Sequence, residues 1–202
     1  MILPLLLALC VTVAAALPAC QQPGMRSASK ATVLWNGGPL TDWKMAGPGE
    51  FVIEDGALRA TGGMGLLWYA KKDFKDFRLE LEWKTEAAGN NAGIFGRFPD
   101  PGVDPWVAVN EGYEIQICDG ADGLHGTGSV YSFCAPSHMP TKPAGEWNHY
   151  SITVVGQDYT IAINGEIVNR FLGFRGERGY VGLQNHDDGS PVRFRNIRIT
   201  PL

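Results

Sequence analysis

The sequence has few basic residues and no run of them. Lys and Arg together number 17 against 21 Asp and Glu, so the formal net charge of the 202 residues is -4. Proteins that bind nucleic acid neutralise its phosphates with clustered Lys and Arg side chains. Because no such cluster occurs, we expect no nucleic-acid partner.

A helical hydrophobic stripe of useful length is also missing, as are an internal repeat and a low-complexity linker. Turn-forming residues are plentiful instead, with 26 Gly and 13 Pro. Many turns imply short strands rather than long helices. The composition therefore predicts a single all-β domain.

Long apolar runs are absent except at the start of the chain. Residues 1–20 read MILPLLLALCVTVAAALPAC, a stretch too short and too interrupted to predict a membrane span. No Lys or Arg precedes Arg26, yet an apolar stretch followed by small residues is typical of a signal peptide. We predict an exported protein with a signal peptide at 1–20, a polar tether at 21–31 and a folded domain at 32–202.

The end of the apolar run leaves two kinds of export open. Leu17-Pro18-Ala19-Cys20 resembles a bacterial lipobox, although Pro18 stands where that pattern has a small residue. Lipidation of Cys20 would give a periplasmic or outer-membrane lipoprotein that meets the membrane only through its lipid anchor. Cleavage near Ala16 or Ala19 would instead release a periplasmic or secreted protein.

Cysteine is scarce, with four residues in all. Cys10 and Cys20 lie in or at the end of the apolar run, which leaves Cys118 and Cys134 in the folded domain. An even pair in an oxidising compartment predicts a disulfide, worth about 3 kcal/mol in the chain-entropy model. Two unpaired cysteines remain the alternative.

Alternation of apolar and polar residues predicts the strands. Residues 77–84 alternate without a fault, and Asp55-Gly56 and Asn164-Gly165 between apolar runs predict two hairpins. Many short strands at regular spacing favour a sandwich or a jelly roll. Further strands are expected at 66–70, 92–98, 113–118, 129–133, 150–155, 180–184 and 192–199.

About nine short motifs, in one order along the chain, resemble the 3-keto-disaccharide hydrolase family. This family is described as 3-keto-glucoside 1,2-lyase and 3-keto-2-hydroxyglucal hydratase. The resemblance implies a concanavalin-like jelly-roll sandwich of two antiparallel sheets, in agreement with the strand pattern. The motifs include Leu34-Trp-Asn-Gly37, Phe51-Val-Ile-Glu-Asp-Gly-Ala-Leu58, Asn90-Asn-Ala-Gly-Ile-Phe-Gly-Arg97, Gly112-Tyr-Glu-Ile-Gln-Ile-Cys-Asp119, Thr127-Gly-Ser-Val-Tyr131, Gly182-Leu-Gln-Asn-His186 and Val192-Arg-Phe-Arg-Asn-Ile197.

Polar side chains of three strands fall on matching faces. Successive residues of a strand point to opposite faces, and the resemblance implies that these three strands are neighbours. The side chains expected to converge in one groove are Arg97, Glu114, Gln116, Gln184 and His186. Three further candidates lie next to strands or in a Pro-rich loop, where site residues are common, and they are Asn91, Asp119 and Trp106.

The resemblance implies cleavage of 3-keto-glycosides by elimination followed by hydration, which is net hydrolysis. We expect His186 or Glu114 to be the base, and Arg97 or a divalent metal ion to stabilise the enolate. No tight spacing of metal ligands supports the metal. The residues expected to bind the sugar are Asn91, Gln116, Gln184, Asp119 and Trp106.

Other interpretations of the same residues stay open. Arg97 could pair with an acid across strands, His186 could be a loop histidine, and Trp106 could be a buried loop anchor. The whole domain could be a non-catalytic carbohydrate-binding module of laminin-G or lectin type, or a structural domain of the cell envelope. If it is the enzyme, a sugar 3-dehydrogenase must act upstream to supply the ketone.

Overall fold

The structure is a computed structural model that describes residues 29–202. The predicted signal peptide, Cys20 and most of the predicted tether lie outside these residues. The described chain forms thirteen strands, one short α-helix and one 3-10 turn, so the expected all-β class is confirmed. Neither helix within residues 29–202 is long and apolar enough to cross a membrane.

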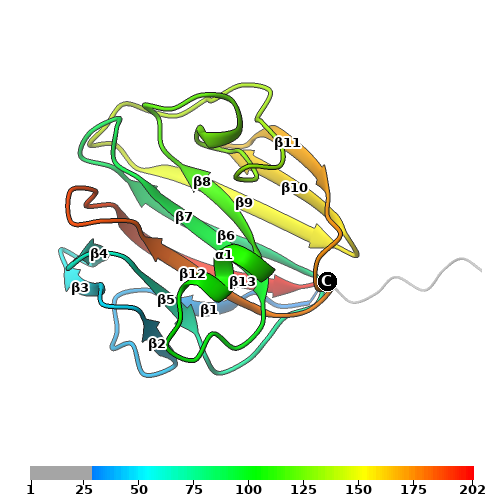
Figure 1. Cartoon of the computed structure of the whole chain (residues 1–202), viewed down its shortest axis with the longest axis horizontal. Coiled ribbons are helices and arrows are strands. Elements are labelled where there is room, and N and C mark those ends of the chain that lie inside the picture. The colour runs from blue at the N-terminus through cyan, green and yellow to red at the C-terminus, as the bar shows by residue number, and fades with distance from the viewer. Residues whose placement is uncertain (1–28) are drawn as a thin grey trace, which may run out of the picture.

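Eight strands form the larger of two antiparallel sheets (Figure 1). They are β1 (Thr32–Trp35), β3 (Glu50–Glu54), β4 (Ala57–Thr61), β6 (Phe77–Lys84), β9 (Asn148–Val155), β10 (Asp158–Ile163), β11 (Glu166–Leu172) and β13 (Arg193–Pro201). Seven follow the order β11-β10-β9-β6-β13-β4-β3, and β1 pairs with β13 beside that path.

Five strands form the second sheet, in the order β2-β5-β12-β7-β8. They are β2 (Trp43–Ala46), β5 (Gly65–Tyr69), β7 (Ala92–Phe98), β8 (Tyr113–Ile117) and β12 (Tyr180–Asn185). The expected neighbourhood of the strands at 92–98, 113–118 and 180–184 is therefore confirmed, since β7 lies between β12 and β8.

The core lies between the two sheets, where the inward residues of each strand meet. Phe77, Leu79, Leu81 and Trp83 of β6 are each at most 2% exposed, as their alternation predicts. The Trp83 ring stacks on Tyr150 with centroids 4.2 Å apart. Burying side chains of this size contributes roughly 1.5–3 kcal/mol each, so this interface holds the sandwich together.

The five-stranded sheet has a second, smaller apolar cluster on the face turned away from the core. We call this face the open face. Its buried apolar residues are Ala46, Leu66, Trp68, Phe95, Phe98 and Ala108. Ala108 belongs to α1 (Trp106–Glu111), which packs on β7 and β8 and lies over the open face in Figure 1.

Two sequence predictions are wrong in the segment that follows β8. Residues 129–133 form no strand, because only Val130 makes isolated bridges and Ser132 has a left-handed φ of 63°. Cys118 and Cys134 are free thiols rather than a disulfide.

The isolated bridges that Val130 makes explain why the two thiols are not bonded. Cys134 pairs with Val130, and Val130 pairs with Ile115, which lies three residues before Cys118. Three residues of a strand span about 10 Å. A disulfide needs Cα atoms within about 7 Å of each other. The alternative of two unpaired cysteines is confirmed.

Candidate active site

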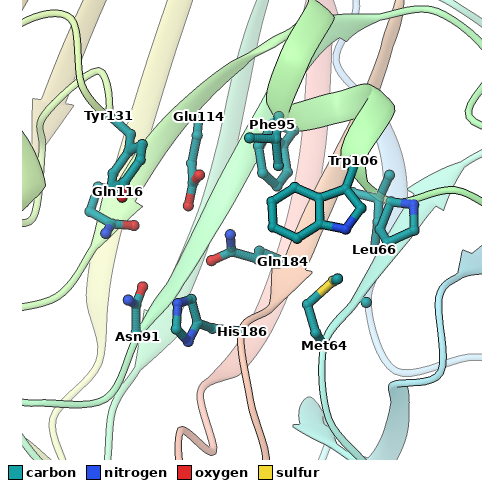
Figure 2. A pocket seen from close by; sticks show the side chains of 13 residues that line it. Met64, Leu66, Asn91, Phe95, Trp106, Glu114, Gln116, Tyr131, Gln184 and His186 are labelled. Carbon is teal, nitrogen blue, oxygen red and sulfur yellow. The ribbon is translucent and has the colours of Figure 1, made fainter.

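A cavity of about 410 Å³ opens on the open face of the five-stranded sheet (Figure 2). Its floor is formed by β5, β12, β7 and β8, and α1 borders one end. The thirteen residues that line it are Met64, Gly65, Leu66, Asn91, Phe95, Pro105, Trp106, Val109, Glu114, Gln116, Tyr131, Gln184 and His186.

Six of the eight sugar-site residues expected from the sequence line this cavity. The pairing register explains the convergence, because Phe95 of β7 lies opposite Glu114 and Gly93 opposite Gln116. Alternation turns Tyr113 and Ile115 into the core and leaves Glu114 and Gln116 on the open face. The six are Asn91, Trp106, Glu114, Gln116, Gln184 and His186.

Glu114 is a buried carboxyl group among the polar residues of the cavity. Only 8% of the residue is exposed. Burial raises the pKa of Glu114 to about 8, and a side-chain hydrogen bond from Gln184 partly opposes this rise. Glu114 is therefore mostly protonated at neutral pH and can donate a hydrogen bond into the cavity.

Gly93 makes room for the Glu114 side chain. A Cβ atom on Gly93 would lie 2.3 Å from Oε1 of Glu114 and 2.6 Å from its Cγ. Real Cβ atoms do not approach other atoms so closely, so any larger residue would displace the carboxyl group. The glycine in the motif at residues 90–97 thus has a role in placing a residue on the neighbouring strand.

Three amide side chains present carbonyl oxygens without partners. Oδ1 of Asn91, Oε1 of Gln116 and Oε1 of Gln184 are buried and accept no hydrogen bond from the described chain. A buried acceptor left unpaired costs about 1–3 kcal/mol. Because all three residues line one cavity, we infer that a ligand rich in hydroxyl donors would satisfy them.

His186 is held by the residue that follows it. Nδ1 of His186 lies 2.6 Å from Oδ2 of Asp187. The Asp187 carboxylate also accepts hydrogen bonds from the backbone N–H of Gly189 and the hydroxyl of Ser190. The hydrogen bond with His186 is the main reason that the pKa of Asp187 is lowered. An ionised Asp187 therefore orients the imidazole ring through Nδ1.

Trp106 stands at the start of α1 and remains 54% exposed. Pro105 precedes it, a residue suited to the first turn because it lacks an N–H to satisfy. Oδ1 of Asp104 accepts the backbone N–H of Trp106 at 3.0 Å. Trp106 thus lines the cavity from the first position of a helix rather than from a loop, and its exposure excludes the alternative of a buried loop anchor.

Arg97 does not reach the cavity, contrary to the prediction. The register between β7 and β12 shifts at this residue, and its φ is 59°, so Arg97 is the extra residue of a β-bulge. The side chain is 1% exposed and points to the other sheet. It donates to the carbonyls of Lys75 and Gly156 and to Asp76.

The interpretation of Arg97 that holds is therefore a structural ion pair with an acid.

Asp119 was also predicted to bind the sugar, and this prediction is wrong because Asp119 does not line the cavity. Its Oδ1 accepts a hydrogen bond from the Thr127 hydroxyl at 2.5 Å, and that hydroxyl also receives the backbone N–H of Cys118. Asp119 therefore fixes the loop that follows β8.

Several lining residues were not predicted as site residues. Tyr131 ends the motif at residues 127–131, and its backbone N–H donates to the carbonyl of Glu114. Apart from Gly65, the others are apolar, and in a sequence they cannot be told from core residues. They are Met64, Leu66, Phe95, Pro105 and Val109.

Few charged ligands for a divalent metal ion line the cavity. Within residues 29–202, no group of three or more His, Cys, Asp or Glu side chains is placed to hold one. The cavity offers one carboxyl group, Glu114, and one imidazole, His186.

Solved structures similar to this chain include a candidate glycosyl hydrolase and a carbohydrate-binding module. A candidate glycosyl hydrolase from Parabacteroides distasonis superposes with a TM-score of 0.73 at 25% identity, covering 86% of this chain and all of that one. The carbohydrate-binding module CBM66 from Bacillus subtilis has a TM-score of 0.63 at 15% identity, covering 79% and 96%. The second likeness shows the jelly-roll fold alone.

Sequence comparison gives the family. A 3-keto-disaccharide hydrolase from Bacteroides thetaiotaomicron is 25% identical, over 84% of this chain and 77% of that protein. Residues 30–200 match the 3-keto-alpha-glucoside-1,2-lyase-like domain. This match spans nearly all of the described chain and includes every residue that lines the cavity. The chain therefore belongs to the carbohydrate-active family of 3-keto-alpha-glucoside-1,2-lyase-like domains.

Proposed function

We propose that this protein is an enzyme that cleaves 3-keto-glycosides by elimination and hydration. The observation that carries the proposal is a buried, neutral carboxyl group, Glu114, facing a cavity with three unpartnered amide oxygens and an oriented histidine. Buried groups with shifted pKa values in a concave site are typical of catalysis. A binding module needs no such carboxyl group.

The chemistry begins at the carbon next to the ketone. The C3 carbonyl of the sugar acidifies the hydrogen on C2. A base takes that proton, the enolate forms, and the C1–O bond breaks to release the aglycone as an alcohol. Water then adds its oxygen to C1 and a proton to C2, so the net reaction is hydrolysis.

His186 is the residue that we propose as the base. Asp187 fixes its Nδ1, which leaves Nε2 as the nitrogen that can accept a proton. The imidazolium that forms is stabilised by the ionised Asp187 and holds the proton that the leaving oxygen needs. A carboxylate that orients a histidine in this way, so that the histidine acts as a base and then as an acid, also occurs in the Ser-His-Asp enzymes.

Glu114, rather than Arg97, is the group that we propose to stabilise the enolate. In its protonated form it can donate a hydrogen bond to the enolate oxygen as negative charge develops there. Carboxyl groups kept neutral by an apolar site serve this purpose in other enolising enzymes. The alternative, in which ionised Glu114 is the base, requires the opposite protonation state and therefore the opposite pH dependence.

We also propose that the protein is exported and that a separate enzyme supplies its substrate. An apolar start to the chain supports export, with Cys20 as the candidate lipid site. The substrate carries a ketone that ordinary glycosides lack. An oxidation of the C3 hydroxyl by a sugar 3-dehydrogenase must therefore precede this reaction.

The test is release of free sugar from a 3-keto-disaccharide, measured from about pH 5 to about pH 9. We expect activity to fall as Glu114 ionises near pH 8, and this alkaline fall to disappear in Glu114→Gln, which still donates a hydrogen bond but cannot ionise. His186→Ala should lose at least about 100-fold in kcat, the size of a typical general-base contribution. Dialysis against EDTA should change nothing.

Three other results would change the proposal. Activity that rises through pH 8 and vanishes in Glu114→Gln would make Glu114 the base. Loss of activity with EDTA would show a metal requirement. Saccharide binding without any turnover would contradict the enzyme and favour the carbohydrate-binding module, for which the exposed Trp106 ring is the supporting observation.

A further inference from the structure

The cavity has two ends of different chemistry. Figure 2 shows the polar side chains toward one side, with Gln184 near the middle and Trp106, Met64 and Leu66 on the other side. We call these the polar end and the apolar end. The polar end consists of Asn91, Glu114, Gln116, Tyr131 and His186, and the apolar end of Met64, Leu66, Phe95, Pro105, Trp106 and Val109.

The apolar end is built on a packed base. Leu66 and Phe95 are at most 1% exposed and belong to the small apolar cluster of the open face. Ala108 is fully buried in the same cluster and anchors α1 to the sheet. The helix thereby holds the ring of Trp106 beside the cavity, although more than half of that residue is exposed.

The apolar end offers almost nothing to hydroxyl groups. Among its six side chains only the Trp106 indole N–H can form a strong hydrogen bond. A second sugar ring placed there would lose hydration from several hydroxyls without gaining protein partners, at about 1–3 kcal/mol for each unpaired group. A flat apolar group would instead bury carbon against the partly exposed Met64 and Val109 and stack on Trp106.

We propose that the apolar end is a subsite for an aromatic aglycone, so that 3-keto-glycosides of aryl or arylalkyl alcohols are preferred to 3-keto-disaccharides. This inference rests on the proposed function. The 3-keto-sugar ring occupies the polar end, where the unpartnered amide oxygens lie, and the aglycone extends past Gln184 toward Trp106. The glycosidic bond then lies between the two ends.

The experiment compares two substrates whose leaving alcohols have nearly equal acidity, so that only contact with the protein differs. These are the 3-keto derivatives of benzyl glucoside and methyl glucoside. We expect kcat/KM for the benzyl substrate to exceed that for the methyl substrate by roughly 10-fold, the value of one stacked and buried ring. Binding of the two unoxidised glucosides is measured in parallel by calorimetry.

Trp106→Ala should bring the benzyl-to-methyl ratio close to about 2, while Trp106→Phe should keep most of the preference because it retains a flat ring. Phe174→Ala is the matched control. Phe174 is also a largely exposed aromatic residue, at 72%, but it does not line the cavity. Circular dichroism of each variant confirms that the fold is retained.

The outcomes separate this inference from the proposed function. Cleavage of both substrates at equal rates would overturn the subsite and leave the function standing. Without cleavage, tighter binding of the benzyl glucoside that is lost in Trp106→Ala would support the subsite and overturn the enzyme. Neither cleavage nor a difference in binding would overturn both.

Discussion

The two sheets turn very different polar faces outward. On the eight-stranded sheet the charged residues of β6 and β13 lie opposite one another and pair. Arg195 contacts Glu82 and Arg198 contacts Glu80, while Arg193 reaches both Glu54 and Glu86. We call these contacts the ion-pair ladder.

On the open face of the five-stranded sheet, several buried oxygen atoms are left without protein partners. Gln116 and Gln184 each have a buried oxygen that accepts no hydrogen bond, and the Glu114 carboxyl group is neutral. Both faces arise from the same alternation of residues along strands. Alternation thus places polar residues on both outer faces, whereas a buried polar group without a partner marks a candidate site only where it also lines a cavity.

The largest expected effect breaks a contact that joins the two sheets. Arg97→Met removes a guanidinium group that is 1% exposed and bonded to two backbone carbonyls and Asp76. We expect the free energy of unfolding to fall by about 3 kcal/mol, because the partners lose a buried charge-assisted donor. Urea denaturation measures it.

Activity of the folded Arg97→Met protein should stay within about twofold of the unchanged enzyme, since Arg97 does not line the cavity. A loss of activity with little loss of stability would return Arg97 to the site and contradict its structural role.

The next effect concerns the fit between neighbouring strands on the open face. Gly93→Ala puts a Cβ atom 2.3 Å from Oε1 of Glu114. Displacing a catalytic group by about 1 Å can cost about 100-fold, so we expect a loss of kcat of that order. Gly96→Ala in the same strand is the control, because its nearest contact would be Phe77 at 3.7 Å.

The kinetic comparison is made on protein whose fold has been checked by circular dichroism. If Gly93→Ala and Gly96→Ala lose activity equally, the packing of Glu114 over Gly93 is not what positions the carboxyl group.

A further effect, smaller for each pH unit, appears in the pH dependence of stability. The pKa of Glu114 rises from 4.5 in the unfolded chain to about 8 in the folded protein, so the folded state binds more protons between these values. The stabilisation is complete below pH 4.5 and is lost as pH rises through 8. It falls by at most about 1.4 kcal/mol per pH unit.

Urea denaturation at several pH values, from about pH 5 to about pH 8, measures this slope. Glu114→Gln cannot titrate, so its curve should be flatter than that of the unchanged protein. Parallel curves would mean that Glu114 is ionised in the folded state at neutral pH.

The smallest effect is expected from the ion-pair ladder. A double-mutant cycle on Arg198 and Glu80, an exposed pair with 3.1 Å between Nη2 and Oε1, should give about 0.2–1 kcal/mol. Activity should not change in either single variant. A coupling above about 2 kcal/mol would show that pairing on this face contributes much more than its exposure suggests.

The sequence predicted the parts of the site that obey strict alternation. Glu114, Gln116 and Gln184 follow from the period of two once the strands are known to be neighbours. The β-bulge at Arg97 breaks that period. Strict alternation from Phe95 would place Arg97 on the open face, but Phe98 lies there instead and Arg97 is turned inward. A bulge of one residue leaves no clear mark in composition or hydropathy.

The helix and the apolar end were not predicted for a different reason. Helix α1 has six residues, too few to show a 3.6-residue repeat, and Trp106 therefore read as a loop residue. Leu66 and Phe95 are apolar strand residues, and their pattern cannot say whether they face the core or a cavity. Cys118 and Cys134 are free thiols because the bridges through Val130 align Cys134 with Ile115, three residues before Cys118. The number of residues between two cysteines does not reveal this alignment.

The most direct test of this account is a titration of Glu114 itself. Carbon-13 labelling of the glutamate carboxyl groups lets each resonance be followed with pH by NMR, and the resonance missing from Glu114→Gln identifies the residue. We predict that it titrates near pH 8, as the neutral hydrogen-bond donor of the proposed mechanism requires. Titration near pH 4.5 would contradict the account, because Glu114 would then be an ordinary carboxylate at neutral pH.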